Sequence, residues 1–319
     1  MKTYIVFPDD VQDFMPVNDM LLPAHEFSKH GAICATSEQF FNGELITNVK
    51  EADTVIIYIT IKAEDQIEKF KNLKCYKVLR NVDPAKSDGI LFKNDLNLHR
   101  KVNFNCMLIG VCSERNLNHL AKKGVKTIKF PHVLDFSGQP SPDDVFSAKE
   151  GDIILSGQQH AKFYPVRHRL GEYFLHQEEK YSVCFLPHPG FKLSESRHKF
   201  IGPAYINLVS KFWAGPVGTG HADGFHMKFL EFAKAYTLPI GNVPSYMDER
   251  AKNLVLQAGI DESDSEMEKL IFDLFSDKEK LMERIVEYSE ILKETNGLQV
   301  NVKRVFDMIN NREYDVIPK

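Results

Sequence analysis

The 319-residue sequence lacks the features of a membrane-spanning or exported chain. Its longest apolar runs, such as Thr54–Ile61 and Tyr181–Leu186, are strand-sized and fall short of the roughly 20 residues needed to cross a bilayer. Neither a long apolar stretch nor a small-residue cleavage site follows Met1, so we expect no signal peptide. These absences predict a cytoplasmic protein without a transmembrane segment, and they leave peripheral contact with a membrane open.

Metal-binding patterns, disulfide patterns and an excess of positive charge are missing as well. The five cysteines show no CxxC spacing and lie mostly in apolar runs, which indicates reduced core thiols. His-x3-His spacing, Cys/His ligand spacing and an Asp-x-Asp pair between strands are lacking, so we expect no metal cofactor. Lys and Arg number 40 against 44 Asp and Glu, and a formal charge of −4 does not favour a nucleic-acid partner.

What is present is an alternation of short apolar runs and helical stretches, typical of βα units around a parallel sheet. A length of 319 residues is comfortable for two such domains. The clearest βαβ unit has a helix at Arg115–Lys123 that ends at Gly124. In the first half, the pattern predicts strands near 3–7, 54–61, 75–80, 105–111 and 126–130.

A second α/β half follows a stretch rich in Ser, Gly, Pro and Asp. We therefore predict a first domain at 1–135, a linker at 136–150, and a second domain at 151–300. A C-terminal helix at 301–319 is expected to pack back on the first domain. Within the second half we expect strands at 152–156, 181–186 and 238–240, a helix from Pro165, helices at 203–211 and 225–236, and an amphipathic helical pair within 266–294.

The most informative segment runs from Asp223 to Gly241 and contains an acid, a glycine turn, an amphipathic helix and a short apolar strand. Gly224 lets the backbone approach a ligand. The helix that opens at Phe225 and His226 offers unpaired N–H groups and the positive end of its dipole. Both features suit a diphosphate, so the segment predicts a phosphate site.

Two carboxylates, Asp223 and Glu231, flank this site. The first precedes the helix and the second lies about two turns along it, so both can face one cleft. Carboxylates bind sugar hydroxyls well because they accept charge-assisted hydrogen bonds from vicinal groups. The alternative is that Asp223 caps the helix and Glu231 is solvated. The apolar neighbours of Glu231 indicate instead a carboxylate that needs a partner.

The segment Asp223-Gly-Phe-His-Met-Lys-Phe-Leu-Glu231 resembles the Glu-Gly-Phe-Gly-(x4)-Glu signature of retaining GT-B glycosyltransferases of the group 1, family-four-like type. The spacing, the glycine and the phenylalanine match, whereas Asp stands at the first acid and His226 at the second glycine. The resemblance implies an α/β fold of two Rossmann-like domains facing each other across a cleft, an acceptor-side domain at 1–135 and a nucleotide-sugar-binding domain at 151–300. It also implies that Asp223 and the loop amides contact the donor sugar and that Glu231 holds the nucleotide ribose.

The resemblance extends upstream to the first strand, glycine loop and basic helix of the family's donor domain. The strand and loop correspond to Ile153 through Ser156 and Gly157. Pro165 suits a first helical turn, which places Arg167 and Arg169 where they could neutralise a leaving diphosphate.

Two further residues are candidate donor contacts. Lys162 precedes the basic helix, and for it, as for the two arginines, a solvated surface charge is the alternative. His188 follows the strand at 181–186, at the edge where open α/β sheets bind ligands, with a structural role as its alternative.

In the first half, residues 107–114 and 124–135 resemble the last βα unit and the inter-domain crossing of the same family. Together the similar segments cover about half of the chain. The end of the strand at 3–7 lacks the glycine-rich loop common in relatives. The remaining candidates for acceptor contacts are acids at strand ends, which are also typical solvated caps: Asp9, Asp10, Asp83 and Glu114.

The resemblance implies a metal-independent, retaining transfer of a sugar from a nucleoside diphosphate to a hydroxyl of a glycan, lipid or protein. The nucleotide sugar is the donor substrate and no cofactor is implied. Asp223, Glu231 and Arg167 would carry the chemistry. The two acids would hold the donor sugar and the ribose, while cationic side chains and helix N–H groups would stabilise the diphosphate as the glycosidic C–O bond breaks. Because a fold does not fix a reaction, a sugar-nucleotide epimerase or hydrolase and a non-catalytic nucleotide-sugar-binding subunit remain alternatives.

Overall fold

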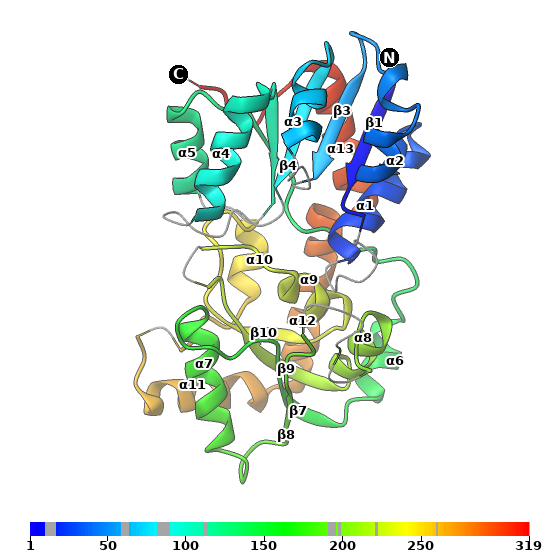
Figure 1. The fold of residues 1–319 in the computed structure, drawn as a ribbon. Coiled ribbons are helices and arrows are strands. Elements are labelled where there is room, and N and C mark those ends of the chain that lie inside the picture. The colour runs from blue at the N-terminus through cyan, green and yellow to red at the C-terminus, as the bar shows by residue number, and fades with distance from the viewer. Residues whose placement is uncertain are drawn as a thin grey trace. The chain divides into compact units, whose positions relative to one another are not determined.

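The computed structural model describes residues 1–9, 17–58, 64–81, 90–110, 114–190, 196, 199–220, 223–259 and 261–318. The chain divides into two compact units, both visible in Figure 1. Unit 1 comprises Met1–Val133 together with Leu298–Lys319, and unit 2 comprises Leu134–Gly297. Each unit is built around its own parallel sheet, which confirms the predicted α/β class.

Unit 1 contains a six-stranded parallel sheet with the order β2-β1-β3-β4-β5-β6. Its strands are short apolar runs that helices cover on both faces, so every residue of Thr54–Tyr58 is buried. The strands are β1 (Thr3–Phe7), β2 (Ile33–Thr36), β3 (Thr54–Tyr58), β4 (Tyr76–Asn81), β5 (Cys106–Ile109) and β6 (Thr127–Lys129).

The helices of unit 1 come from both ends of the chain. The C-terminal helix α13 packs against α1 and β6, and Figure 1 shows it in red among the strands and helices of the N-terminal part. Its residues Val302 and Val305 are fully buried in the core with Phe27 and Ile128. The helices are α1 (Val17–Lys29), α2 (Ser37–Asn42), the 3-10 helix η2 (Ile46–Asn48), α3 (Glu64–Lys71), α4 (Ile90–Val102), α5 (Glu114–Lys122) and α13 (Leu298–Asn311).

Unit 2 contains a four-stranded parallel sheet with the order β10-β9-β7-β8. The strands are β7 (Gly151–Ser156), β8 (Val183–Leu186), β9 (Phe212–Val217) and β10 (Leu238–Gly241). Because β8 lies on one side of β7 and β9 on the other, the winding direction reverses between β7 and β9. Open α/β sheets bind ligands beyond the carboxyl ends of their strands at such a reversal.

Seven helices complete the described part of unit 2. The longest of them, α12, packs against α9 and α10, and its Tyr288 donates a hydrogen bond to the carbonyl of Phe229 at 3.1 Å. The helices are α6 (Pro142–Ser147), α7 (Pro165–Leu175), α8 (Pro203–Val209), α9 (Met227–Lys234), α10 (Glu249–Leu254), α11 (Asp264–Ser276) and α12 (Lys278–Asn296).

The segment 136–150, predicted as a linker, contains α6 and clusters with unit 2. Ser141 caps this helix by accepting a hydrogen bond from the amide of Asp144 at 3.2 Å. Pro142 occupies the first turn and Val145 is buried. The Ser, Pro and Asp residues that indicate a linker are therefore the start of a short, packed helix.

The sequence does not predict strands β2 and β9. In β9, Gly215 and Pro216 are residues that usually weaken or interrupt a strand. A Cβ atom at Gly215 would lie 2.4 Å from the carbonyl oxygen of Ile154 and 3.0 Å from the Phe232 ring, so only glycine fits there. The register between β7 and β9 runs as far as the pair Ile153 and Ala214, and Pro216 lies beyond it.

Candidate functional site

The candidate site lies at the carboxyl end of β7 in unit 2. Ser156 is the last, fully buried residue of that strand, and Gly157 follows in the left-handed conformation with φ +84°. A Cβ atom at Gly157 would lie 3.2 Å from Nη1 of Arg167 and 3.3 Å from Cε of Lys228. The glycine therefore lets the chain pass directly beside two cationic side chains.

Arg167 comes from the first turns of α7, which begins at Pro165 as the sequence predicts. Its side chain is buried, with 4% of the residue exposed, and its guanidinium lies over the Tyr164 ring at 4.4 Å from the centroid. Nη1 donates a hydrogen bond to the carbonyl of Gln158 at 3.3 Å. Nε has no hydrogen-bond partner among the described residues. A buried guanidinium with an unsatisfied donor is suited to an anion.

Lys228, in the first turn of α9, is the second cation of the site. Its Nζ donates to the hydroxyl of Tyr205 on α8 at 2.5 Å. The Tyr205 hydroxyl also shares a hydrogen bond with Oγ of Ser156, 2.8 Å away, in which either hydroxyl can donate. The three side chains form a hydrogen-bonded row from α9 through α8 to the end of β7.

Glu231 lies one turn beyond Lys228 on α9, and its Oε2 is 3.1 Å from the Lys228 Nζ. The two side chains are 24% and 14% exposed, so the pair is mostly shielded from water. The partner that the apolar neighbours of Glu231 require is therefore Lys228. The alternative, in which Glu231 is only a solvated helix residue, does not agree with this contact.

The charges of this cluster depend on one another. Burial lowers the pKa of the Arg167 guanidinium, and Tyr164, Tyr205 and Glu231 act in the opposite direction. Burial also opposes the charge on Lys228, but Glu231 and Tyr205 outweigh it, so the pKa of this ammonium lies above its usual value. Glu231 is in contact with Lys228 and acts on Arg167 through its charge, so one carboxylate stands against two cations and the cluster has an excess of positive charge.

The start of α9 is organised by Thr219 in the loop after β9. The Thr219 carbonyl accepts hydrogen bonds from the Gly224 amide at 2.9 Å and from Nε2 of His226 at 2.9 Å. His226 is the N-cap residue of α9 and makes no side-chain capping bond to it. The helix begins at Met227, two residues later than predicted, so its first amide groups lie next to Lys228.

Gly224 and Phe225 lie close to this point, but in structural roles. The Gly224 amide is used by Thr219, and the Phe225 amide donates to the Tyr246 hydroxyl at 2.7 Å. The Phe225 ring is buried and stacks on Phe229 at 5.6 Å between centroids. The left-handed residue of the turn is Asp223, with φ 51°, rather than Gly224.

The other acid of the signature, Asp223, faces the turn after β10. Its carboxylate accepts from the Ser245 amide at 3.0 Å and from the Ser245 hydroxyl at 2.5 Å. It does not cap α9, whose N-cap is His226.

Three further candidates, Arg169, Lys162 and His188, have contacts of their own. Arg169 donates to the carbonyl of Glu262 and lies 3.9 Å from Asp264, because residues two apart point to different sides of a helix. Lys162 is exposed beside the Phe163 ring. His188 accepts a hydrogen bond from the Gly190 amide at 3.0 Å, within its own loop.

The predicted acceptor contacts are described only in part. Asp9 accepts a hydrogen bond from the Glu38 amide at 2.8 Å, at the carboxyl end of β1. Asp10 and Asp83 lie outside the described residues, and Glu114 is described only as the first residue of α5.

Two residues of the site, Lys228 and Tyr205, are not assigned by the sequence analysis. Lys228 stands three positions before Glu231, and this spacing within a helix is the signal that could have found it. Tyr205 is separated from Lys228 by 23 positions and lies on another helix, so no sequence spacing indicates it.

Within the described ranges, no group of three or more His, Cys, Asp or Glu side chains is arranged to hold a metal ion. In the same ranges none of the helices combines the length and hydropathy that a bilayer span requires.

No protein-family model matches the sequence, and no curated protein matches it either. Solved structures do resemble it. An alpha-glucosyltransferase (AGT) in complex with UDP has a TM-score of 0.62 at 13% identity, over 97% of this chain and 99% of that one. HepE from Anabaena, in complex with UDP and glucose, has a TM-score of 0.58 at 11% identity, over 97% and 99%.

A third structure, TarM from S. aureus in complex with UDP and alpha-GlcNAc-glycerol among its ligands, has a TM-score of 0.55 at 9% identity. That match covers 83% of this chain and 57% of TarM. An alpha-glucosyltransferase bound to UDP and a 13-mer DNA is similar as well. At these identities the likeness concerns the fold alone, and it shows that the chain has the GT-B type of α/β fold, with two Rossmann-like units.

Proposed function

We propose that the chain is a retaining, metal-independent glycosyltransferase that moves a sugar from a nucleoside diphosphate to a hydroxyl acceptor. The observation that carries the proposal is the convergence of Arg167, Lys228 and Glu231 beside Gly157, at the point where the strand order of unit 2 reverses. The proposal rests on this local geometry and on the GT-B fold.

The donor diphosphate is assigned to the space between Gly157, Arg167 and the start of α9. The buried Nε of Arg167 lacks a partner, which an anion would supply. Lys228 and the first amides of α9 add positive potential on the other side. Two cationic side chains of the protein thus take the part that a divalent cation plays in other transferases.

The two acids take separate parts of the donor. Glu231 holds the ribose hydroxyls by charge-assisted hydrogen bonds, and Lys228 offsets its charge, which makes a carboxylate tolerable beside a diphosphate. Asp223 accepts hydrogen bonds from the donor sugar with the lone pairs that Ser245 leaves available. Ser156 and Gly157 shape the wall of the site.

In the transfer, the bond between the anomeric carbon and the diphosphate oxygen breaks, and the acceptor oxygen bonds to the same face of that carbon. The departing diphosphate takes the proton of the acceptor hydroxyl, so the step needs no base from the protein. Arg167 and Lys228 stabilise the negative charge that develops on the leaving group. Interactions that strengthen as this charge grows are the ones that raise the rate.

UDP is the proposed nucleotide of the donor, because the similar structures were solved with UDP. The proposed acceptor is a hydroxyl of a glycan, lipid or protein, and the proposed place of action is the cytoplasm, with peripheral membrane contact for a lipid acceptor. DNA, which some of the similar structures contain, is disfavoured here by the formal charge of −4.

A thermal-shift screen across UDP-, GDP-, ADP- and CDP-sugars tests the donor, because a ligand bound only by the folded state raises the melting temperature. We expect the largest rise with a UDP-sugar. Product analysis with and without glycan, lipid, protein or DNA acceptors then tests the reaction.

The other outcomes of the product analysis each indicate one of the alternative functions. Free sugar formed equally without acceptor indicates a hydrolase, a changed sugar on the nucleotide indicates an epimerase, and tight binding without turnover indicates a binding subunit. The absence of a thermal shift with all four nucleotide sugars would contradict the proposal.

A further inference from the structure

The turn that follows β10, here called the Ser245 turn, forms hydrogen bonds to the loop before α9 through two adjacent residues, Ser245 and Tyr246. Ser245 donates from its amide and its hydroxyl to the two carboxylate oxygens of Asp223, at 3.0 and 2.5 Å. Tyr246 accepts from the Phe225 amide at 2.7 Å. Neither Ser245 nor Tyr246 belongs to the signature segment, yet both fix its first residues.

The backbone conformation of Asp223 requires stabilising contacts of this kind. With φ 51° it is one of the few described non-glycine residues in the left-handed region, a conformation that persists where the surroundings hold it. The two donors of Ser245 engage both oxygens of the carboxylate and so fix the plane of the group. About four lone-pair positions exist on a carboxylate, so two stay available for a ligand.

The Ser245 turn is itself anchored to α10. Lys252 donates from Nζ to the Ser245 carbonyl at 2.5 Å and to Glu249 at 2.6 Å, and its side chain is only 13% exposed. A lysine shielded to this degree and shared between a carbonyl and a carboxylate restricts where the turn can lie.

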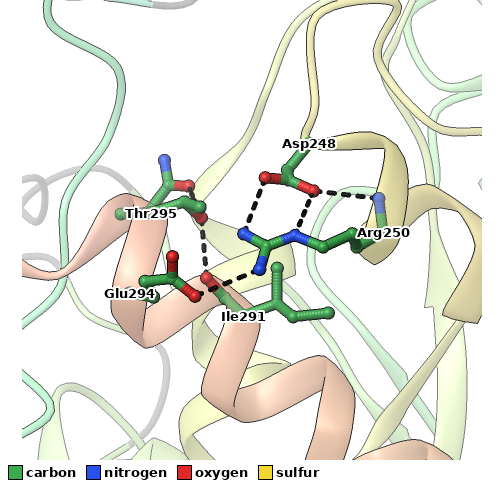
Figure 2. A network of polar contacts seen from close by, with 6 residues as sticks. Asp248, Arg250, Ile291, Glu294 and Thr295 are labelled. Carbon is green, nitrogen blue, oxygen red and sulfur yellow. Dashed lines mark hydrogen bonds and ion pairs between the residues drawn. The ribbon is translucent and has the colours of Figure 1, made fainter.

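The helix α10 is in turn joined to α12. Figure 2 shows Arg250 bridging Asp248, at the start of α10, and Glu294 on α12. The contacts to Asp248 are 3.1 and 3.0 Å, and the contact to Glu294 is 3.2 Å. A continuous series of polar contacts therefore runs from α12 through α10 and Ser245 to Asp223.

We propose that Ser245 is a positioning residue that sets the Asp223 carboxylate for the donor sugar, and that Lys252 acts on Asp223 through Ser245. This inference rests on the proposed function, because it needs Asp223 to contact the sugar. It predicts a selective effect: the sugar part of the donor is affected, whereas the nucleotide part, held by Arg167, Lys228 and Glu231, is not.

The test compares the dissociation constants of UDP and UDP-glucose, measured by calorimetry on the full chain. In Ser245→Ala, we expect UDP-glucose to bind about tenfold more weakly, since two hydrogen bonds to a charged group become one or none, while UDP changes less than about twofold. Ser245→Thr keeps the hydroxyl, so the ratio of the dissociation constants of UDP-glucose and UDP should stay at its wild-type value. Lys252→Met should shift the ratio in the same direction by a smaller factor.

Ser210→Ala is the matched control, because among the described residues the Ser210 hydroxyl donates to the Asn207 carbonyl, at the end of its own helix, and not to the donor site. A change of both constants by the same factor in Ser245→Ala, or of neither, would overturn the inference and leave the proposed function intact. Wild-type protein that binds neither UDP nor UDP-glucose would remove the proposed function and this inference together.

Discussion

Two lysines of unit 2 that are largely shielded from water lie at opposite ends of the strands of its four-stranded sheet, and the groups that they contact differ. At the carboxyl edge, Lys228 contacts the Glu231 carboxylate and the Tyr205 hydroxyl. At the amino edge, Lys149 donates to the carbonyls of Phe212 and Tyr236, at 2.6 and 2.7 Å, and lies near the Trp213 ring.

The pKa values of the two ammonium groups move in opposite directions. Burial, with a smaller contribution from Lys278, lowers the pKa of Lys149 to about 7. For Lys228 the anionic partner outweighs burial and the pKa is raised. The surroundings of Lys149 therefore favour the neutral amine more than water does, whereas those of Lys228 favour its charged form. A retained charge next to an unsatisfied Arg167 donor is what distinguishes a ligand site from a structural contact.

The largest expected effect comes from removing the carboxylate of Glu231. We expect Glu231→Ala to raise the dissociation constant of UDP by about 100-fold, since about 3 kcal/mol of charge-assisted hydrogen bonding to the ribose is lost. Inorganic pyrophosphate, which has no ribose, should bind as well as before or more tightly because a negative charge is removed. Calorimetry with both ligands checks this.

Glu287→Ala, on α12, is the control for that comparison. If the variant at Glu231 kept wild-type affinity for UDP, or lost pyrophosphate affinity to the same degree, the role given to this carboxylate would be wrong.

The next largest effect is a difference in pyrophosphate binding between variants of Arg167 and of Arg169, which lie two positions apart on α7. We expect Arg167→Gln to weaken pyrophosphate binding by about 30-fold, because one charge-assisted contact of roughly 2 kcal/mol is lost. Arg169→Gln should change the same constant less than about twofold, since Arg169 contacts Glu262 and Asp264 instead. Equal losses in the two variants would indicate a general electrostatic effect rather than a defined contact.

A smaller effect is expected at Gly157. In Gly157→Ala the added Cβ meets both Arg167 and Lys228 at a residue with φ +84°, so we expect UDP to bind about fivefold more weakly and the protein to lose about 1 kcal/mol of stability. Gly138→Ala is the matched control, because Gly138 has φ +66° but nothing within 4 Å of the added atom.

Thermal unfolding measures the stability of both glycine variants, and calorimetric titration measures their affinity for UDP. A similar loss of stability in the two, with a loss of UDP affinity only at Gly157, is the expected pattern. Loss of UDP affinity in both would place the diphosphate elsewhere.

The smallest effect concerns Lys149 and appears only as a pH dependence. Because its folded-state pKa lies below the usual value of 10.5, the unfolded chain binds more protons between about pH 7 and 10. Stability from this residue therefore rises with pH across that window. The melting temperature of wild type relative to Lys149→Met should increase from pH 7 to pH 9, and a constant difference would show that Lys149 stays charged.

The sequence predicts most elements of this fold because strands and helices each carry a local pattern. It does not predict β9, because Gly215 and Pro216 are untypical of a strand. The Ile154 carbonyl and the Phe232 ring, which leave room only for glycine at position 215, come from distant segments of the sequence. It also predicts a linker where Ser141 and Pro142 begin α6.

For the candidate site, local sequence patterns predict residues that lie on one helix, but they do not predict contacts between separate segments. Glu231 and the need for a partner can be inferred from its apolar neighbours, and Arg167 from its place after Pro165. The contact of Lys228 with Tyr205, and that of Asp223 with Ser245, join segments more than 20 positions apart. Such contacts depend on how the helices and loops pack around the sheet, so the sequence alone does not indicate them.

The most direct measurement for the central claim is a crystal structure of the chain with UDP-glucose. The diphosphate should lie within hydrogen-bond distance of Arg167 and of the first amides of α9, with the ribose hydroxyls on Glu231. Density for the nucleotide away from Gly157, or a Glu231 carboxylate that contacts only Lys228 in the presence of bound nucleotide, would contradict the account.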